Sequence, residues 1–290
     1  MQQRAFGSSG LEVSVVGLGA GHIGEESYDD ATAARLLHAA LDSGITFVDT
    51  ARGYGASEER IGRHLRGRRD EVVLSTKVGY DVPGTEDWTA AAVGGGVDRA
   101  LRVLQTDVLD VVFLHSCPVE VLERGEVVQA LLAAHEAGKV RVPGYSGENE
   151  ALAWAVASGH FGAVQTSVNL ADQWSLRHVL PAAAAAGLGV VAKRPIANAP
   201  WRFAERPVGA YAEDYWERLR TLDLQPADGA WHDTALRFSA FAPGVSTAIV
   251  GTGSPAHLAE AVTAAHAGPL PEDEVRRWRE AFPPDWPGLV

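Results

Sequence analysis

Short runs of β-branched and other apolar residues alternate along the chain with stretches in which Ala, Leu and charged residues recur at helical spacing. This alternation is typical of strand–helix units that form a parallel sheet. It predicts strands at 13–16, 46–48, 72–75, 108–114, 140–143, 163–167, 189–192 and 247–250. Helices are predicted near 30–41, 58–65, 90–104, 121–137, 150–157, 176–186, 231–241 and 255–265. Eight such units in about 250 residues match the size and count of an α/β fold, the (β/α)8 TIM barrel.

The segments outside these units are assigned to the same domain, which is predicted to span 1–290 because no Pro/Ser-rich linker interrupts it. Residues 1–13, with Gly-Ser-Ser-Gly in their middle, predict an N-terminal β-hairpin at the bottom of the barrel. Residues 195–229 follow the seventh strand as a long loop, and such loops usually shape the active-site mouth of a barrel. Residues 272–290 predict a C-terminal helix and a Pro-rich tail.

The composition indicates a folded chain with a large core. The chain has 290 residues, of which 46% are hydrophobic and 21% charged. A net charge of −12 disfavours nucleic acid as a partner, because nucleic-acid binding relies on Lys and Arg to neutralise phosphates. The longest apolar run, 181–192, is too short and too rich in Ala to span a bilayer, so membrane insertion and secretion are not predicted. The lone Cys117 favours a cytoplasmic protein, expected as a monomer or small homo-oligomer.

A glycine pattern at 19–24, Gly-Ala-Gly-His-Ile-Gly, raises the alternative of a Rossmann dinucleotide-binding domain. In that motif the helix begins within the glycines, so that its first amides meet a pyrophosphate. Here six polar residues intervene, and Asp29 or Asp30 is the predicted helix cap. The adjacent Glu25 and Glu26 would also repel a pyrophosphate. The pattern therefore favours a glycine-rich turn that passes close beneath a ligand.

Four ionisable residues lie at or just beyond the ends of successive predicted strands, where the catalytic residues of barrels collect. They are Asp49, Tyr54, Lys77 and His115. Because neighbouring parallel strands end about 5 Å apart, these side chains can converge in one pocket. An ammonium beside a phenol favours the phenolate, and a carboxylate behind the ammonium keeps it charged and oriented. Tyr54 is therefore a candidate general acid, with Lys77 and Asp49 as its relay.

These residues belong to motifs that extend over nearly the whole chain. Residues 49–62 read Asp-Thr-Ala-Arg-Gly-Tyr-Gly-Ala-Ser-Glu-Glu-Arg-Ile-Gly, 75–79 read Ser-Thr-Lys-Val-Gly and 114–115 read Leu-His. Together with 7–19, 136–141 and 249–251, they resemble the aldo-keto reductase family. The resemblance implies a barrel that binds NAD(P)(H) without a Rossmann domain and transfers a hydride between nicotinamide C4 and the carbonyl carbon of an aldehyde, ketone or sugar.

The resemblance also implies roles for single residues. Tyr54 would donate the proton to the carbonyl oxygen, with Lys77 and Asp49 tuning it. His115 would hydrogen-bond the substrate oxygen. Ser146 and Gln165 match the positions that hold the nicotinamide carboxamide in the family, although Gly147 stands where the family commonly has Asn.

The end of the seventh strand departs from the family, which often has a Tyr there to stack on the nicotinamide. This chain has Lys193, Arg194 and Pro195 instead. An Arg guanidinium could lie flat on the ring, but a cation is repelled by oxidised nicotinamide. Lys193 or Arg194 could instead reach the cofactor pyrophosphate or form an ordinary structural ion pair, and the sequence leaves both open.

The segment after the eighth strand predicts a phosphate site, because a glycine-rich turn there opens a helix with Pro in its first turn. The candidate residues are Gly251, Thr252, Gly253, Ser254 and His257. Many NADP-preferring relatives carry Lys or Arg in place of Gly253, and loss of that cation removes about 1.5–3 kcal/mol from binding of the 2′-phosphate. Two alternatives stay open: the protein uses NAD, or Arg202 or Arg206 restores the binding of NADP.

The substrate side offers three aromatic candidates, Tyr80, Trp88 and Trp201, which could wall a small carbonyl or alcohol substrate. Packing of the rim loops is the alternative role for all three. A non-catalytic, nicotinamide-binding regulatory subunit on the same barrel is the alternative function. A metal-dependent hydrolase that uses Asp49 and His115 is disfavoured, because the sequence lacks a clustered set of metal ligands.

Overall fold

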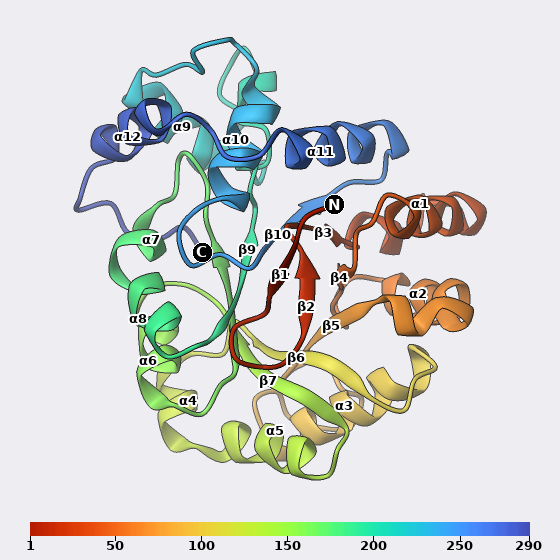
Figure 1. The fold of residues 1–290 in the computed structure, drawn as a ribbon. Coiled ribbons are helices and arrows are strands. Elements are labelled where there is room, and N and C mark those ends of the chain that lie inside the picture. Colours follow the sequence, from red (N-terminus) through yellow and green to blue (C-terminus); the bar gives the residue numbers. More distant parts are fainter.

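The computed structural model describes residues 1–290 and has a closed barrel of eight parallel strands at its centre (Figure 1). Each strand pairs with the next along the chain, and the last closes onto the first. The strands are β3 (Val16–Gly19), β4 (Phe47–Asp49), β5 (Val73–Val78), β6 (Leu109–His115), β7 (Val140–Ser146), β8 (Ala163–Ser167), β9 (Gly189–Lys193) and β10 (Thr247–Gly251). The predicted TIM barrel is confirmed.

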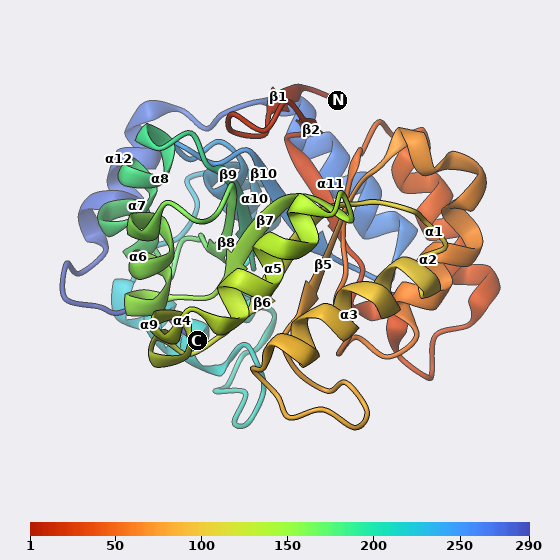
Figure 2. The same cartoon turned by 90° about the horizontal axis from the view of Figure 1, so that it is seen from below.

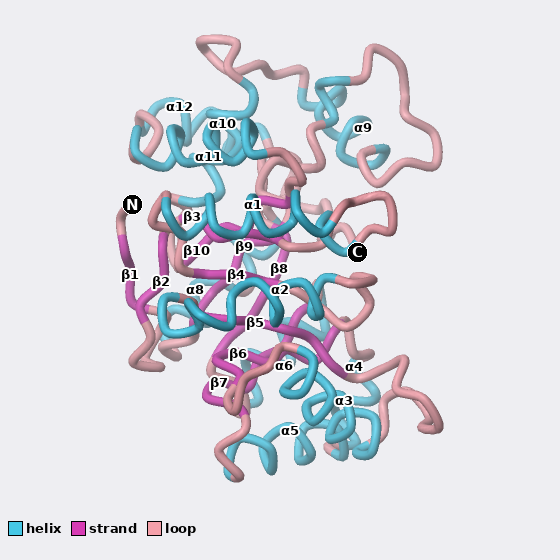
Figure 3. Tube along the Cα trace, turned by 90° about the vertical axis from the view of Figure 1, so that its right-hand side faces the viewer, coloured by secondary structure: helices cyan, strands magenta, loops and turns pink.

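Helices form a layer around the barrel, as the tube in Figure 3 shows. They are α1 (Asp30–Asp42), α2 (Ser57–Leu65), α3 (Ala90–Val103), α4 (Val119–Arg124), α5 (Glu126–Glu136), α6 (Asn149–Ser158), α7 (Trp174–His178), α8 (Leu180–Ala185), α9 (Glu213–Leu222), α10 (Trp231–Ala240), α11 (Pro255–Ala267) and α12 (Glu272–Ala281). Short 3₁₀ helices cover His22–Gly24 (η1), Arg66–Glu71 (η2) and Pro200–Arg202 (η3). None of the helices is both long and apolar enough to cross a membrane.

Two helices predicted as continuous are interrupted. The 121–137 helix divides into α4 and α5 at Gly125, whose φ of 79° lies outside the helical region. The 176–186 helix divides into α7 and α8 at Val179. Pro181 explains the second break, because it has no backbone N–H to donate to the preceding turn. Helical periodicity continues across both breaks and therefore did not reveal them.

The first barrel strand was predicted at 13–16, and this is wrong. Val13 belongs to the hairpin of β1 (Gln3–Ala5) and β2 (Glu12–Ser14), where it pairs with Arg4. The hydroxyl of Ser14 donates to the carbonyl of Val16 at 2.7 Å, at the point where the chain leaves the hairpin for the barrel. The apolar run therefore crosses from one sheet to the other, and β3 begins at Val16.

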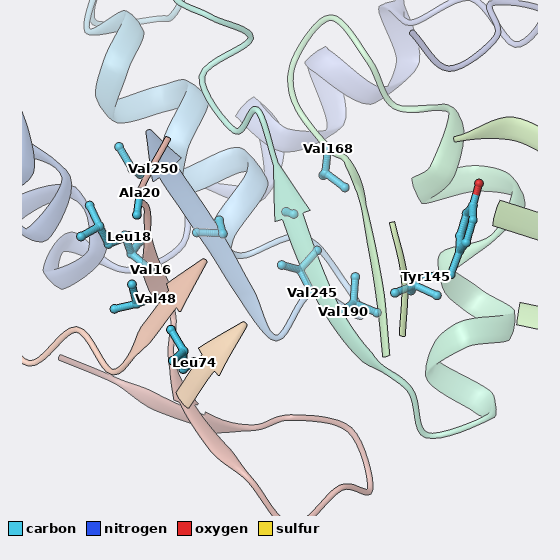
Figure 4. Packing of buried hydrophobic residues seen from close by; sticks show 14 of the residues in the cluster. Val16, Leu18, Ala20, Val48, Leu74, Tyr145, Val168, Val190, Val245 and Val250 are labelled. Atoms are coloured by element: carbon cyan, nitrogen blue, oxygen red, sulfur yellow. The ribbon is translucent and has the colours of Figure 1, made fainter. Parts of the chain in front are cut away.

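The hairpin closes one end of the barrel. Figure 2 shows it at the end opposite the segment that follows β9. Phe6 and Val13 are fully buried and pack with Phe47, Phe113 and other inward-facing residues in a small inner core. A larger core lies between the strands and the helices, and Figure 4 shows part of it.

The 195–229 segment follows β9 as predicted, but it is not structureless. It contains η3 and α9, which pack against each other. The indole N–H of Trp216 in α9 donates to the carbonyl of Phe203 at 3.0 Å and helps to hold the two together. The segment therefore forms a partly helical structure at the end of the barrel where the strands end.

Phe6→Ala tests the closing role of the hairpin. Loss of a fully buried ring from a packed core is expected to lower the free energy of unfolding by about 3–5 kcal/mol. Val208→Ala is the control, because Val208 is 80% exposed and its truncation should change stability by about 0.5 kcal/mol or less. Denaturant unfolding of both variants measures the difference, and equal stabilities would show that Phe6 does not secure the barrel end.

Candidate active site

A buried ion pair lies at the carboxyl ends of β4 and β5. The Lys77 Nζ lies 2.7 Å from Asp49 Oδ2, and both side chains are 2% exposed or less. The same ammonium donates to the carbonyl of Thr50 at 2.8 Å. These two partners fix the position of the charge, because a buried ammonium needs acceptors for its N–H groups.

Further side chains satisfy the other oxygen of the carboxylate. Asp49 Oδ1 accepts from Ser75 Oγ at 2.7 Å and from Gln165 Nε2 at 3.0 Å. Gln165 Oε1 in turn accepts from Ser146 Oγ at 2.9 Å. Ser146 and Gln165 are thus joined to the ion pair by one hydrogen-bond network inside the barrel, and their contact with a nicotinamide carboxamide stays a prediction.

Tyr54 lies over the ion pair, on the loop between β4 and α2. The Lys77 Nζ is 4.8 Å from the centroid of its ring. The 19–24 glycine segment packs against this loop. The carbonyl of Gly24 accepts from the backbone N–H of Ala56 at 3.0 Å. A Cβ at Gly24 would lie 1.7 Å from the Tyr54 carbonyl oxygen, so no side chain fits there. The glycines therefore serve close backbone packing beneath Tyr54.

The same segment does not have Rossmann geometry. Its glycines end in η1, and α1 begins only at Asp30. Asp29 caps α1 by accepting from the backbone N–H of Thr32 at 2.8 Å. A pyrophosphate cannot meet the first amides of this helix from the glycine turn, which removes the Rossmann alternative.

Burial and charge act in opposite directions on Lys77. Burial lowers the pKa of its ammonium, whereas Asp49 and Tyr54 raise it, and the net effect is a pKa above the usual value. The ammonium therefore stays charged at neutral pH. A fixed positive charge beside the Tyr54 ring is the electrostatic requirement for a phenol that gives up a proton.

His115 ends β6 and faces Tyr54. The two rings are perpendicular, with centroids 6.0 Å apart. Burial, together with the ammoniums of Lys77 and Lys193, lowers the pKa of His115 to about 3. His115 is therefore neutral at physiological pH. The structure thus brings Asp49, Tyr54, Lys77 and His115 together at one end of the barrel.

Of the three predicted aromatic residues, Tyr80 contacts His115 and Trp88 contacts Tyr80. Tyr80 stacks on its ring with centroids 5.3 Å apart, and the Tyr80 hydroxyl lies 2.6 Å from His115 Nδ1. Trp88 packs edge-on against Tyr80 at 5.8 Å. Trp201 stacks on Trp231 with centroids 5.2 Å apart. Trp201 thus packs within the rim segment, and its contact with a substrate stays a prediction.

Lys193 forms an ion pair that the sequence left as one of two alternatives. Its Nζ lies 3.1 Å from Oε1 of the buried Glu148. Burial lowers the pKa of Lys193, and Glu148 opposes that effect. Glu148 also accepts from Ser167 and Thr166 of β8. Sequence reasoning missed Glu148, although its place two residues after Ser146 put it at a strand end.

Arg194 and Pro195 are also bound within the protein. Arg194 Nη1 donates to the hydroxyl of Tyr215 at 3.4 Å and to the carbonyl of Leu289 at 3.3 Å. The carbonyl of Pro195 accepts from Ser239 Oγ at 2.8 Å. Arg194 therefore links the end of β9 to α9 and to the C-terminal tail.

A cavity of about 560 Å³ lies between α10 and α11, beside the end of β10. Of the predicted phosphate-site residues, Gly251, Thr252 and His257 line it, whereas Gly253 and Ser254 do not. Ser254 instead caps α11 by accepting from the backbone N–H of His257 at 3.4 Å. The ionisable side chains of the lining are His232, Asp233, His257 and Glu260.

Tyr28 occupies the space beside Gly253. Its hydroxyl donates to the Gly253 carbonyl, and a Cβ at Gly253 would lie 2.7 Å from the edge of its ring. A longer side chain at this position would displace the ring. Tyr28 lies in the loop before α1, far from Gly253 in sequence, and no pattern in the chain signalled this contact.

Comparison with known proteins shows the family of the chain. The sequence matches the aldo/keto reductase family model over residues 15–282. The chain belongs to this family. It is therefore an NAD(P)-dependent oxidoreductase. Its relatives include aldo-keto reductase YhdN of Bacillus subtilis, 33% identical over 62% of this chain and 58% of that protein. L-galactose dehydrogenase of Arabidopsis thaliana is 29% identical over 68% of this chain and 66% of that protein.

Solved structures of family members have the same fold. Aldo-keto reductase AKR11C1 from Bacillus halodurans, in its holo form, superposes with a TM-score of 0.86 and 26% identity, covering 98% of this chain and 97% of that one. The aldo/keto reductase from Klebsiella pneumoniae, in complex with NADP and acetate, gives a TM-score of 0.76 and 26% identity, covering 98% and 96%.

The pH dependence of stability tests the neutral state of His115. Its folded pKa of about 3 lies below the ordinary 6.5, so unfolding takes up a proton between these values. His115 therefore contributes stability above pH 6.5 that is lost as pH falls toward 3. As the pH falls through this range, the free energy of unfolding in urea should decrease less for His115→Gln than for the parent. Parallel losses in the two proteins would show that His115 titrates normally.

Proposed function

We propose that this protein reduces a carbonyl group with Tyr54 as the proton donor and His115 as a second hydrogen-bond donor to the same oxygen. The observation that carries the proposal is the placement of Tyr54 beside the buried Lys77–Asp49 pair. When bound, the nicotinamide supplies or accepts the hydride. Tyr54 gives its proton to the oxygen of the reduced carbonyl, and the Lys77 charge favours the phenolate that remains.

The residues present fit a nicotinamide dinucleotide. The α10–α11 cavity has largely apolar walls and opens beside the backbone of Gly251 and Thr252, where amides at a helix start suit a phosphate. The Ser146 hydroxyl and the Gln165 amide lie inside the barrel, hydrogen-bonded to each other and, through Gln165, to Asp49. We assign the adenosine to the cavity and the carboxamide to Ser146 and Gln165.

The substrate is a small carbonyl or alcohol. Some relatives carry sugar names: L-galactose dehydrogenase, D-threo-aldose 1-dehydrogenase of Pseudomonas sp. and 6-dehydroglucose reductase of Novosphingobium aromaticivorans. Aldoses therefore belong in a substrate panel, beside aldehydes and ketones. The stacked rings of Tyr80 and His115 give one wall of the proposed substrate site.

Tyr54→Phe tests the proton donor. It should lower kcat for NAD(P)H-dependent carbonyl reduction by about a hundredfold or more, because the proton donor is lost. Cofactor affinity, measured by fluorescence titration, should stay the same. Tyr211→Phe is the matched control, because Tyr211 is 89% exposed and its variant should turn over like the parent.

Two outcomes would contradict the proposal. Cofactor binding without turnover on the whole panel would favour the regulatory-subunit alternative. Turnover that survives Tyr54→Phe would place the proton donor elsewhere.

The cofactor choice has its own test. No Lys or Arg lines the α10–α11 cavity, whereas Asp233 and Glu260 do, and Tyr28 fills the space beside Gly253. A 2′-phosphate there would meet carboxylates without a charge-assisted partner. NADH should therefore bind at least as tightly as NADPH in parallel fluorescence titrations. Tighter binding of NADPH than of NADH would contradict this expectation. If Arg202→Ala then abolished the preference for NADPH, Arg202 would be the cation that binds the 2′-phosphate.

A further inference from the structure

The hydroxyl of Tyr80 contacts one of the two ring nitrogens of His115. The Tyr80 Oη lies 2.6 Å from His115 Nδ1, and the stacked rings are tilted by only 27°. A neutral imidazole has one N–H donor and one bare nitrogen acceptor. Which nitrogen carries the proton depends on the hydrogen bond that the other nitrogen makes.

The surroundings identify Tyr80 as the donor in this hydrogen bond. Burial raises the pKa of the Tyr80 phenol, so the group keeps its proton. His115 Nδ1 is the one protein acceptor within reach of that proton. If Nδ1 carried a hydrogen instead, the Tyr80 hydroxyl would lack a protein acceptor. The arrangement in which Tyr80 donates therefore satisfies both groups.

Trp88 is a second contact of the Tyr80 ring. Trp88 packs edge-on against it, and the backbone N–H of Trp88 donates to the Gly79 carbonyl at 2.7 Å. Gly79 has a φ of 130°, and a Cβ there would lie 2.2 Å from the Trp88 ring. Only glycine allows this approach. The chain thus places Tyr80 two residues after the end of β5 and holds it against His115.

We propose that Tyr80 is a positioning residue that fixes the tautomer of His115, with the proton on Nε2, so that His115 donates to the carbonyl oxygen that is reduced. The opposite tautomer would present a bare nitrogen to that oxygen and repel it. Tyr80 thus acts through His115 and need not touch the substrate. This inference rests on the proposed carbonyl reduction, but the state of the imidazole can be measured without turnover.

The direct test is ¹⁵N NMR of the histidine rings in the free protein, with His115 assigned by its loss in His115→Gln. We expect the signature of a neutral imidazole protonated at Nε2 in the parent and a mixture of tautomers in Tyr80→Phe. Phe keeps the stacked ring and removes only the hydroxyl. A parent imidazole protonated at Nδ1, or one unchanged in Tyr80→Phe, would overturn the proposal.

Kinetics supply the second test. Tyr80→Phe should lower kcat by about tenfold, the worth of one hydrogen bond. In the His115→Gln background the same change should have little further effect, because the group that Tyr80 positions is absent. An equal loss in both backgrounds would mean that Tyr80 acts on the substrate directly.

Tyr145→Phe is the matched control for both tests. It removes a buried hydroxyl that donates to the Cys117 carbonyl at 3.0 Å. It should leave the His115 signals in place. If Tyr145→Phe changed those signals as much as Tyr80→Phe does, the tautomer would respond to the loss of any nearby buried hydroxyl. That result would overturn the specific role of Tyr80.

Discussion

The site depends on one interaction, the buried ion pair of Lys77 and Asp49. Two charges taken out of water cost several kcal/mol each, and such a pair persists only where further hydrogen bonds satisfy both groups. Here Thr50, Ser75 and Gln165 supply them. Because Gln165 comes from β8, across the barrel from β4 and β5, this network of the ion pair is complete only in the closed barrel. The chemistry of the site therefore depends on the closure of the sheet.

The same charge lies near two residues of the proposed reaction. The Lys77 ammonium is 4.8 Å from the centroid of the Tyr54 ring, where the proposed proton donor needs a positive charge. The ammonium also opposes protonation of His115, which lowers its pKa together with burial. A protonated His115 would compete with Tyr54 as the acid, whereas a neutral one can offer a hydrogen bond without acting as the acid. The same cation therefore fits both roles in the proposed reaction, with Tyr54 as proton donor and His115 as hydrogen-bond donor.

The sequence revealed those parts of the fold and site that follow local rules. The spacing of apolar residues and the composition predicted eight strand–helix units. The predicted strand ends placed Asp49, Lys77 and His115 close together. Some features depended on contacts that the local pattern does not show. Val13 was assigned to the barrel because pairing with Arg4 leaves the same apolar pattern. The contact of Tyr28 with Gly253 depends on a partner that no local pattern specifies.

The residues around the ion pair and the segment after β9 are held in place in different ways. The proposed catalytic residues stand on strand ends, or on a loop packed directly against them, where the barrel fixes the backbone. The segment after β9 has several non-glycine residues with positive φ between 194 and 199, a conformation that costs free energy. Side chains hydrogen-bond to carbonyls of this segment. Asn169 donates to the carbonyl of Arg194 at 3.1 Å, and Ser239 donates to the carbonyl of Pro195 at 2.8 Å. These donors belong to the β8–α7 loop and to α10. The segment after β9 is therefore ordered by side chains around the barrel, and substitutions there can change this segment while leaving the ion pair intact.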